Sequence, residues 1–312
     1  MSEANKEKNF ISAVVYTYNA EKEIQDCLRM INTYLREHFL KYEIICVNDA
    51  STDQTTQKIK EFASDSEGEI ISILNMSFHQ GLEASMDAGV DLAIGDFVYE
   101  FDSSLVSYSA DLLLKTYMHC LEGFDIVSAC PENARHAMSD QFYSVYNKYS
   151  GSQYKLRTES FRILSRRAIN RVHSMSKTIP YRKAIYANCG LATDALYYQS
   201  PIAIPAASHR EKELQMSTAQ DALVLYTDIA YRFAMTFSMA MMLVTALVVL
   251  YTVFIYINNK PVAGWTTTML FLSFGFFGIS VMLTILIKYA SLILRTVFTK
   301  QKYVVESIEK LK

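Results

Sequence analysis

Two long runs of uncharged residues constrain the fold of this chain more than any other feature. No charged side chain occurs from Phe233 to Ile257, and none occurs from Pro261 to Ile287. Each run has about 25 residues, and roughly 20 are enough to cross the hydrocarbon core of a bilayer. The link at residues 258–264 is too short for a domain, so the two runs predict a transmembrane hairpin. A buried helical pair in a soluble core is the alternative, but uncharged runs of this length are rare there.

Basic residues flank the predicted hairpin on one side. They are Arg210, Lys212 and Arg232 before the first run, and Lys288, Arg295, Lys300 and Lys302 after the second. The link holds only Lys260. Because basic loops stay on the cytoplasmic side, we predict a multi-pass plasma (inner) membrane protein whose N-terminal domain and two termini are cytosolic. Residues 211–231 are amphipathic, and residues 288–298 combine apolar residues with Lys288 and Arg295, so we expect interfacial helices there. The apolar residues of the first segment are Leu214, Leu223, Leu225, Ile229 and Tyr231.

Strands and helices alternate in the first part of the chain. Apolar, β-branched and aromatic runs predict strands at Phe10–Tyr18, Glu43–Val47 and Glu69–Leu74, at a segment ending at Asp102, and at Asp125–Ala129. Amphipathic segments between them predict helices. After Pro131 the pattern weakens to a helix at 137–150, a short strand at Phe161–Leu164 and a helix that opens at Ser165. This order predicts an α/β domain with a Rossmann-like, mostly parallel sheet covered by helices.

The strand that ends at Asp102 organises the predicted domain. Its apolar residues lead into Asp102, Ser103 and Ser104. In an open parallel sheet, ligands bind beyond the carboxyl ends of the strands. Asp102 is therefore expected where a nucleotide or an ion binds.

A basic segment follows the predicted sheet. Residues 155–183 hold nine basic residues and one acidic residue, Glu159. A solvated helix face is one interpretation, but ordinary surfaces mix the two signs of charge, so this segment favours an anion-binding surface. The five cysteines show no CxxC spacing and are expected to be buried thiols in a reducing compartment.

Several motifs together carry a family resemblance. Val47–Asp53 (VNDASTD) matches V-[ND]-D-x-S-x-D, Phe101-Asp102 matches the entry to D-x-D, Phe161–Arg166 (FRILSR) matches F-R-L-[LI]-S-[RK], and Pro261–Thr266 resembles P-G-[WY]-[TS]. In this order and spacing, the chain resembles family 2 glycosyltransferases of GT-A fold. The resemblance is to the subgroup that glycosylates polyprenyl phosphate and carries a C-terminal transmembrane hairpin.

The resemblance implies a domain plan. We expect a GT-A domain at 1–210 and an amphipathic interfacial helix at 211–231. A transmembrane hairpin follows at 232–288, with spans at about 233–257 and 262–287. An interfacial helix and cytosolic tail complete the chain at 289–312.

The resemblance also implies roles for individual residues. It assigns nucleotide-sugar binding, with a UDP-sugar favoured, to Tyr18, Asn19, Asp49, Gly81, Asp102 and Ser104. It assigns a divalent cation, Mg²⁺ or Mn²⁺, to Asp102 and Ser104. Catalysis is expected at Asp102, Glu159 and Ser160, and lipid-phosphate binding at Arg162, Arg166 and Arg182.

Two positions depart from the family pattern. The second Asp of D-x-D is Ser104, and the acidic residue before F-R-L is Ser160, with Glu159 beside it. A hydroxyl is a poorer metal ligand than a carboxylate, so we expect weak cation binding. A lipid phosphate is largely ionised at neutral pH, and such a nucleophile needs positioning more than deprotonation.

We therefore expect a membrane-anchored inverting glycosyltransferase. It would move a hexose from a nucleotide diphosphate sugar to polyprenyl (undecaprenyl) phosphate on the cytosolic face, with the lipid bilayer but no nucleic acid as a partner. A homo-oligomer is left open. The alternative is a non-catalytic relative with a degenerate metal site, acting as a membrane scaffold or sugar-nucleotide binder.

Overall fold

The computed structural model describes residues 6–66, 70–133, 137–152, 154–175, 181–201, 223, 227, 229–258, 264–297 and 303–311. The chain divides into two compact units. The first comprises Met1–Ala219 with Lys300–Lys312, and the second comprises Gln220–Thr299. Each is described by itself.

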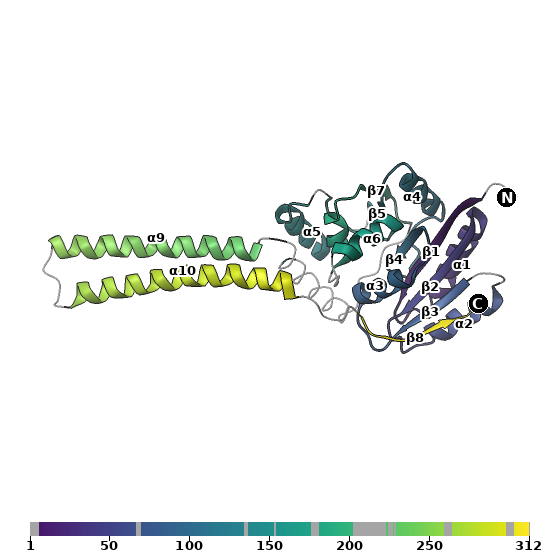
Figure 1. Ribbon diagram of the computed structural model, residues 1–312, viewed down its shortest axis with the longest axis horizontal. Helices are drawn as coiled ribbons and strands as arrows, with labels where there is room; N and C mark the ends of the chain where they lie inside the picture. The colour runs from purple at the N-terminus through teal and green to yellow at the C-terminus, as the bar shows by residue number, and fades with distance from the viewer. Residues whose placement is uncertain are drawn as a thin grey trace. The chain divides into compact units, whose positions relative to one another are not determined.

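The first unit is built on an eight-stranded sheet of order β7-β5-β6-β4-β1-β2-β3-β8 (Figure 1). The strands are β1 (Glu7–Thr17), β2 (Phe39–Asn48), β3 (Ile70–Met76), β4 (Phe97–Phe101), β5 (Ile126–Pro131), β6 (Phe161–Ser165), β7 (Thr193–Tyr198) and β8 (Val305–Lys310). β1 pairs in parallel with both β2 and β4, whereas β6 runs antiparallel between β4 and β5. The prediction of a mostly parallel α/β sheet is confirmed.

Helices cover both faces of this sheet. They are α1 (Ile24–His38), α2 (Thr55–Asp65), α3 (Leu82–Leu92), α4 (Asp111–Leu121), α5 (Ala137–Tyr149), α6 (Arg166–Met175) and α7 (Arg182–Asn188). The buried residues of α1, α2 and α4 join one core with the side chains of Ile11, Ala13 and Val15 on β1. α3 covers the other face, where a Cβ added at Gly89 would lie 2.4 Å from Cγ1 of Val14. Only glycine lets α3 lie this close to the sheet.

The C-terminal residues correct one expectation. Residues 289–312 were predicted as an interfacial helix and a tail, but β8 within them pairs antiparallel with β3. Its residues alternate between half-buried and exposed positions. β8 satisfies the backbone groups that β3 would otherwise leave unpaired at the edge of the sheet. A short strand rich in charged residues gives little local signal, because its partner lies more than 200 residues earlier in the chain.

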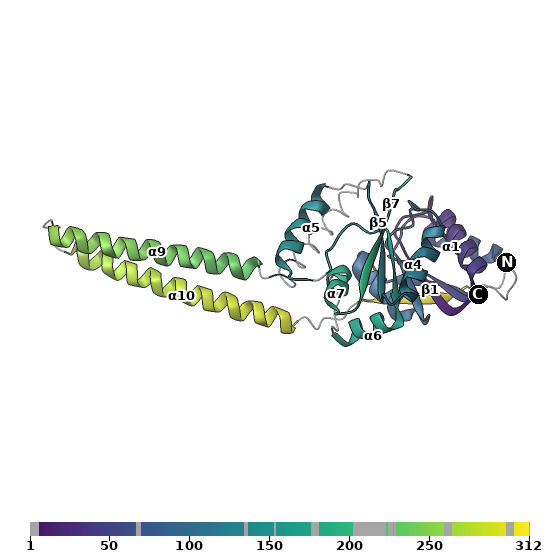
Figure 2. The same cartoon turned by 90° about the horizontal axis from the view of Figure 1, so that it is seen from above.

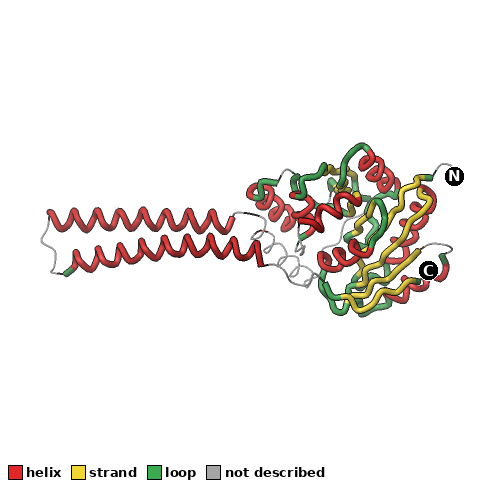
Figure 3. The backbone as a smooth tube through the Cα atoms, in the orientation of Figure 1, coloured by secondary structure: helices red, strands yellow, loops and turns green. Residues whose placement is uncertain are grey.

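The second unit contains two long helices, α9 (Ile229–Asn258) and α10 (Trp265–Val297). They lie side by side as a hairpin (Figures 2 and 3). Thr284 donates a hydrogen bond of 2.7 Å from its hydroxyl to Oγ of Ser238, across the helix pair. Met235–Asn258 and Trp265–Ala290 are long and apolar enough to cross a membrane, by length and composition alone.

The structure describes one of the two segments that were predicted to form interfacial helices. The segment 288–298 is not a separate helix, because α10 continues without a break to Val297. The predicted amphipathic helix at 211–231 lies almost entirely outside the described residues.

Candidate functional site

Asp49 fixes the turn that leads into α3. It follows β2 directly and is fully buried. Its Oδ1 accepts a hydrogen bond of 2.8 Å from the backbone N–H of Gln80, and its Oδ2 accepts one of 2.8 Å from Gly81. Gly81 has a φ of 88°, in a region that favours glycine. Both carboxylate oxygens of Asp49, which is predicted to bind the nucleotide, therefore already accept hydrogen bonds from the protein.

Tyr18 and Asn19 lie beside this turn. The ring of Tyr18 stacks on that of His79, with centroids 4.1 Å apart, and Nδ1 of His79 lies 2.9 Å from Oδ2 of Asp49. Oδ1 of Asn19 accepts a hydrogen bond of 2.8 Å from the backbone N–H of Thr52. The structure thus brings together Tyr18, Asn19, Asp49 and Gly81, as predicted for a nucleotide site. The structure adds His79, for which the sequence analysis predicted no role. Its position between β3 and Gly81 was the feature of the sequence that could have indicated a place in this site.

Asp102 lies between two guanidinium groups. Its Oδ2 accepts a hydrogen bond of 2.7 Å from Nη2 of Arg162, and its Oδ1 accepts one of 2.8 Å from Nη2 of Arg182. The side chains of both arginines are 1% exposed, and that of Asp102 is 11% exposed. Arg162 reaches Asp102 because β6 pairs with β4 so that Arg162 stands opposite Glu100.

Further carboxylates hold the same two arginines. Oε2 of Glu100 accepts from Nη1 of Arg182 at 2.7 Å and also from Nη1 of Arg162. Nε of Arg162 donates to Glu159 at 2.9 Å, and Nε of Arg182 donates to Glu83 at 3.1 Å. Every guanidinium nitrogen of both residues therefore contacts a carboxylate. We call these six residues the arginine–carboxylate cluster: Glu83, Glu100, Asp102, Glu159, Arg162 and Arg182.

Asp102 and the two arginines of the cluster stay charged despite burial. Burial alone would raise the pKa of Asp102, but Arg162, Arg182 and Lys183 hold that pKa well below its usual range. Burial alone would lower the pKa of each arginine, but the nearby carboxylates raise both values well above the usual one. Four carboxylates thus face three cations in a space largely closed to water.

The remaining predicted catalytic and metal residues border this cluster. Oγ of Ser104 donates to the backbone oxygen of Tyr16 at 3.2 Å, and Oγ of Ser160 lies 2.6 Å from the hydroxyl of Tyr198. Because Ser104 carries no charge and both oxygens of Asp102 are held by arginines, the residues present do not fit a divalent cation at this position.

Arg166 does not join the cluster. Its Nε donates to the backbone oxygen of Gly95 at 2.9 Å, and its Nη2 donates to that of Ala93 at 2.9 Å. β6 runs antiparallel to β4, so Arg162 lies near the carboxyl end of β4 whereas Arg166 lies beyond its amino end. The predicted set of three phosphate-binding arginines is therefore divided between opposite ends of the sheet.

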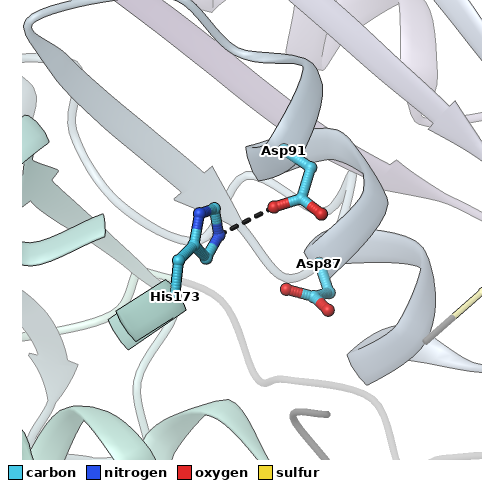
Figure 4. Close-up of side chains that lie close together, drawn as sticks. All are labelled: Asp87, Asp91 and His173. Carbon is cyan, nitrogen blue, oxygen red and sulfur yellow. Dashed lines mark ion pairs between the residues drawn. The ribbon is translucent and has the colours of Figure 1, made fainter. Parts of the chain in front are cut away.

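A second group of side chains joins α3 to α6. Asp87 and Asp91 on α3 approach His173 on α6 (Figure 4). Their possible ligand atoms lie within 4.8 Å of one another, as a metal site would require. Nε2 of His173 lies 2.7 Å from Oδ1 of Asp91, and the hydroxyl of Tyr303 donates to Oδ2 of Asp91 at 2.7 Å. With both oxygens of Asp91 engaged, we interpret this group as a link between the two helices and the segment before β8.

Comparisons with known proteins agree on one family. A sequence profile described as "Glycosyl transferase family 2" matches residues 12–188. An uncharacterized glycosyltransferase of Synechocystis sp. is 26% identical over 186 residues, which are 58% of each chain. The "Prophage bactoprenol glucosyl transferase homolog" of Escherichia coli is 25% identical over 60% of this chain and 62% of its own length. An "Undecaprenyl-phosphate 4-deoxy-4-formamido-L-arabinose transferase" of Pectobacterium atrosepticum is 24% identical over 60% of this chain and 59% of its own length.

The matches thus span about six tenths of the length of these curated relatives. Among solved structures, a mannosyltransferase from Pyrobaculum calidifontis in complex with GDP-Man and Mn²⁺ has a TM-score of 0.51. It is 13% identical, and the match covers 95% of this chain and 77% of that one. At this identity the likeness supports the fold alone.

Proposed function

The chain belongs to glycosyl transferase family 2, and from this premise we propose that it transfers a hexose from a nucleotide diphosphate sugar to polyprenyl phosphate. The observation that carries the proposal is the convergence of the family's motif residues at one edge of the sheet. Asp49 follows β2 and Asp102 follows β4, and these two strands flank β1. This is the edge at which open parallel sheets bind ligands.

The acceptor class is inferred from relatives and from the second unit. Two of the relatives are named for transfer to bactoprenol or undecaprenyl phosphate. Two helices that are long and apolar enough to cross a membrane would hold the domain next to such a lipid. The asymmetric basic flanks support placing both termini and the transferase domain in the cytosol.

In the proposed reaction, a phosphate oxygen of the lipid attacks the anomeric carbon of the sugar. The bond between that carbon and the nucleoside diphosphate breaks, its electrons stay on the leaving diphosphate, and the configuration inverts. An ionised lipid phosphate has no proton to lose, so the engagement of Glu159 by Arg162 does not prevent the attack. The task of the protein is to position two anions against each other.

The residues of the site divide this task. Tyr18, with His79 stacked on it, offers an aromatic surface for the base, and Asn19 holds the adjacent loop. Within the arginine–carboxylate cluster, Arg162 and Arg182 offer guanidinium N–H donors to phosphate groups. UDP-sugars are the favoured donors, and Mn²⁺ or Mg²⁺ would assist only if it displaced an arginine from Asp102.

A transfer assay tests the proposal. Purified full-length protein in detergent is incubated with polyprenyl phosphate and a panel of nucleotide sugars, with Mn²⁺ or with EDTA. Formation of a glycosylated lipid phosphate supports the proposal.

The alternative, a non-catalytic sugar-nucleotide binder, is favoured by the complete engagement of Asp49 and Asp102 by protein donors. Binding of a nucleotide sugar without transfer to any lipid phosphate would support that alternative instead.

A further inference from the structure

We propose that Arg162 and Arg182 take the place of the divalent cation at Asp102, so that this chain binds the diphosphate of its donor without a metal ion. The inference rests on the proposed function. It concerns a replacement that the family resemblance does not imply.

The first reason is that the ligand atoms are already used. A cation at Asp102 would have to displace Arg182 from Oδ1 or Arg162 from Oδ2, where the hydrogen bonds are 2.8 and 2.7 Å long. Displacing either arginine would leave its guanidinium buried against fewer carboxylates, which is strongly unfavourable. Ser104 offers a neutral oxygen, which does little to offset the dehydration of Mg²⁺ or Mn²⁺.

The second reason is the balance of charge. A complete D-x-D site with its ion sets two carboxylates against two positive charges. Here four carboxylates face Arg162, Arg182 and the nearby Lys183. The two arginines together carry the formal charge of +2 that a divalent ion carries, so they supply positive charge next to Asp102 without an ion.

The third reason is that N–H groups remain for a phosphate, which has to displace part of the cover over these 1% exposed side chains to reach them. Nη1 and Nη2 of Arg182 each make one hydrogen bond among the described residues, and each carries a second N–H. Nη2 of Arg162 likewise makes one hydrogen bond among the described residues and carries a second N–H. Carboxylates on both arginines fix the planes of the guanidinium groups, and such planar groups match phosphate oxygens well.

The test begins with Mn²⁺ alone. Full-length wild-type protein in detergent is titrated with Mn²⁺, and the free ion is followed by electron paramagnetic resonance. We expect no binding with a Kd below about 1 mM, because the carboxylates of the cluster are held by arginines. Binding of UDP, GDP and their sugar conjugates, followed by calorimetry, should be the same in EDTA as in Mn²⁺.

The variant Arg182→Met should gain affinity for Mn²⁺. It releases Glu83 and Oδ1 of Asp102 and leaves Arg162 as the remaining arginine partner of Glu100 and Asp102. Carboxylate oxygens freed in this way are ligands that divalent ions prefer. We expect Mn²⁺ binding at least tenfold tighter than in wild type. Arg167→Met is the matched control, since it also releases a carboxylate, that of Asp125, but at the opposite end of the sheet. It should not change Mn²⁺ binding.

Three outcomes would overturn the inference: micromolar Mn²⁺ binding by the wild type that Asp102→Asn abolishes, nucleotide binding that EDTA abolishes and Mn²⁺ restores, or tight Mn²⁺ binding created by Ser104→Asp alone. Mn²⁺ binding that Asp102→Asn leaves unchanged belongs to another site, such as the group of Asp87, Asp91 and His173. The wild-type titration decides the matter even if Arg182→Met does not fold. Absence of nucleotide binding in every condition would overturn the proposed function, whereas the titration with Mn²⁺ alone would still test the replacement of the cation.

Discussion

Arg162→Met should destabilise the first unit strongly. The side chain of Arg162 is 1% exposed and contacts three carboxylates, those of Glu100, Asp102 and Glu159. Methionine keeps most of the apolar stem but removes the charge, which leaves buried carboxylates with fewer cations. Removing one partner of a buried ion pair costs about 3–5 kcal/mol. At roughly 2–4 °C per kcal/mol for a domain of this size, we expect the midpoint of thermal unfolding to fall by roughly 6–20 °C.

The cysteines provide an assay specific to this unit. All five are buried, and all belong to the first unit. Their reaction with a thiol reagent during heating in detergent therefore reports the opening of that unit. The single tryptophan, Trp265, begins α10, so its fluorescence would follow the second unit instead.

Two comparisons make this prediction sharp. Arg167→Met removes an arginine whose side chain is 69% exposed and contacts one carboxylate, that of Asp125, to which Ser165 also donates. It should lower the midpoint less than Arg162→Met does. The double variant Arg162→Met/Asp102→Asn should be less destabilised than the sum of its single variants, because the two side chains are direct partners. If Arg162→Met lowers the midpoint no more than Arg167→Met does, the cluster does not have the energetic role assigned to it.

Three further predictions address acid stability, packing and topology. The pKa of Asp102 is depressed below its unfolded value of about 3.9, so its stabilisation is present above that pH and is lost as the pH falls towards the folded-state value. Thermal midpoints followed with a pyridyl disulfide, which still reacts with thiols in acid, should therefore fall less steeply from about pH 6 to about pH 3 in Asp102→Asn than in wild type. Gly89→Ala should destabilise by about 1–3 kcal/mol, because its Cβ would lie 2.4 Å from Cγ1 of Val14, and the same assay would show the loss. A cysteine introduced by Asn259→Cys should react with a membrane-impermeant reagent outside the cell while Ser2→Cys is protected, and the reverse pattern would contradict the predicted orientation.

Local patterns were sufficient to predict much of the fold. In α1, the residues Ile24, Leu28, Ile31 and Leu35 are buried at the helical spacing seen in the sequence. The two uncharged runs correspond to α9 and α10 for a similar reason, since length and composition are properties of one segment. The family resemblance then brought the residues around Asp49 into one predicted site, and these residues do lie together.

The arginine–carboxylate cluster could not be predicted in this way. Arg162 lies 60 residues from Asp102 in the sequence, and Arg182 lies 80 residues from it. Their meeting depends on β6 entering the sheet antiparallel beside β4, in a register that sets Arg162 opposite Glu100. No local periodicity specifies that register. The same reversal of direction carries Arg166 away from the site, although it lies only four residues after Arg162.

The basic segment shows why local charge is an uncertain guide to a binding surface. The charged side chains of residues 155–183 are almost all positive, which predicted an anion-binding surface. In the folded chain, Arg182 is instead neutralised by Glu83, Glu100 and Asp102, which all precede that segment. An excess of one sign within a segment can therefore be balanced across the sheet and not at the surface. The same balance explains why Ser104 can replace the second aspartate of D-x-D under the proposal made above. If Arg162 and Arg182 take the place of the cation at Asp102, a second carboxylate is not required to bind an ion.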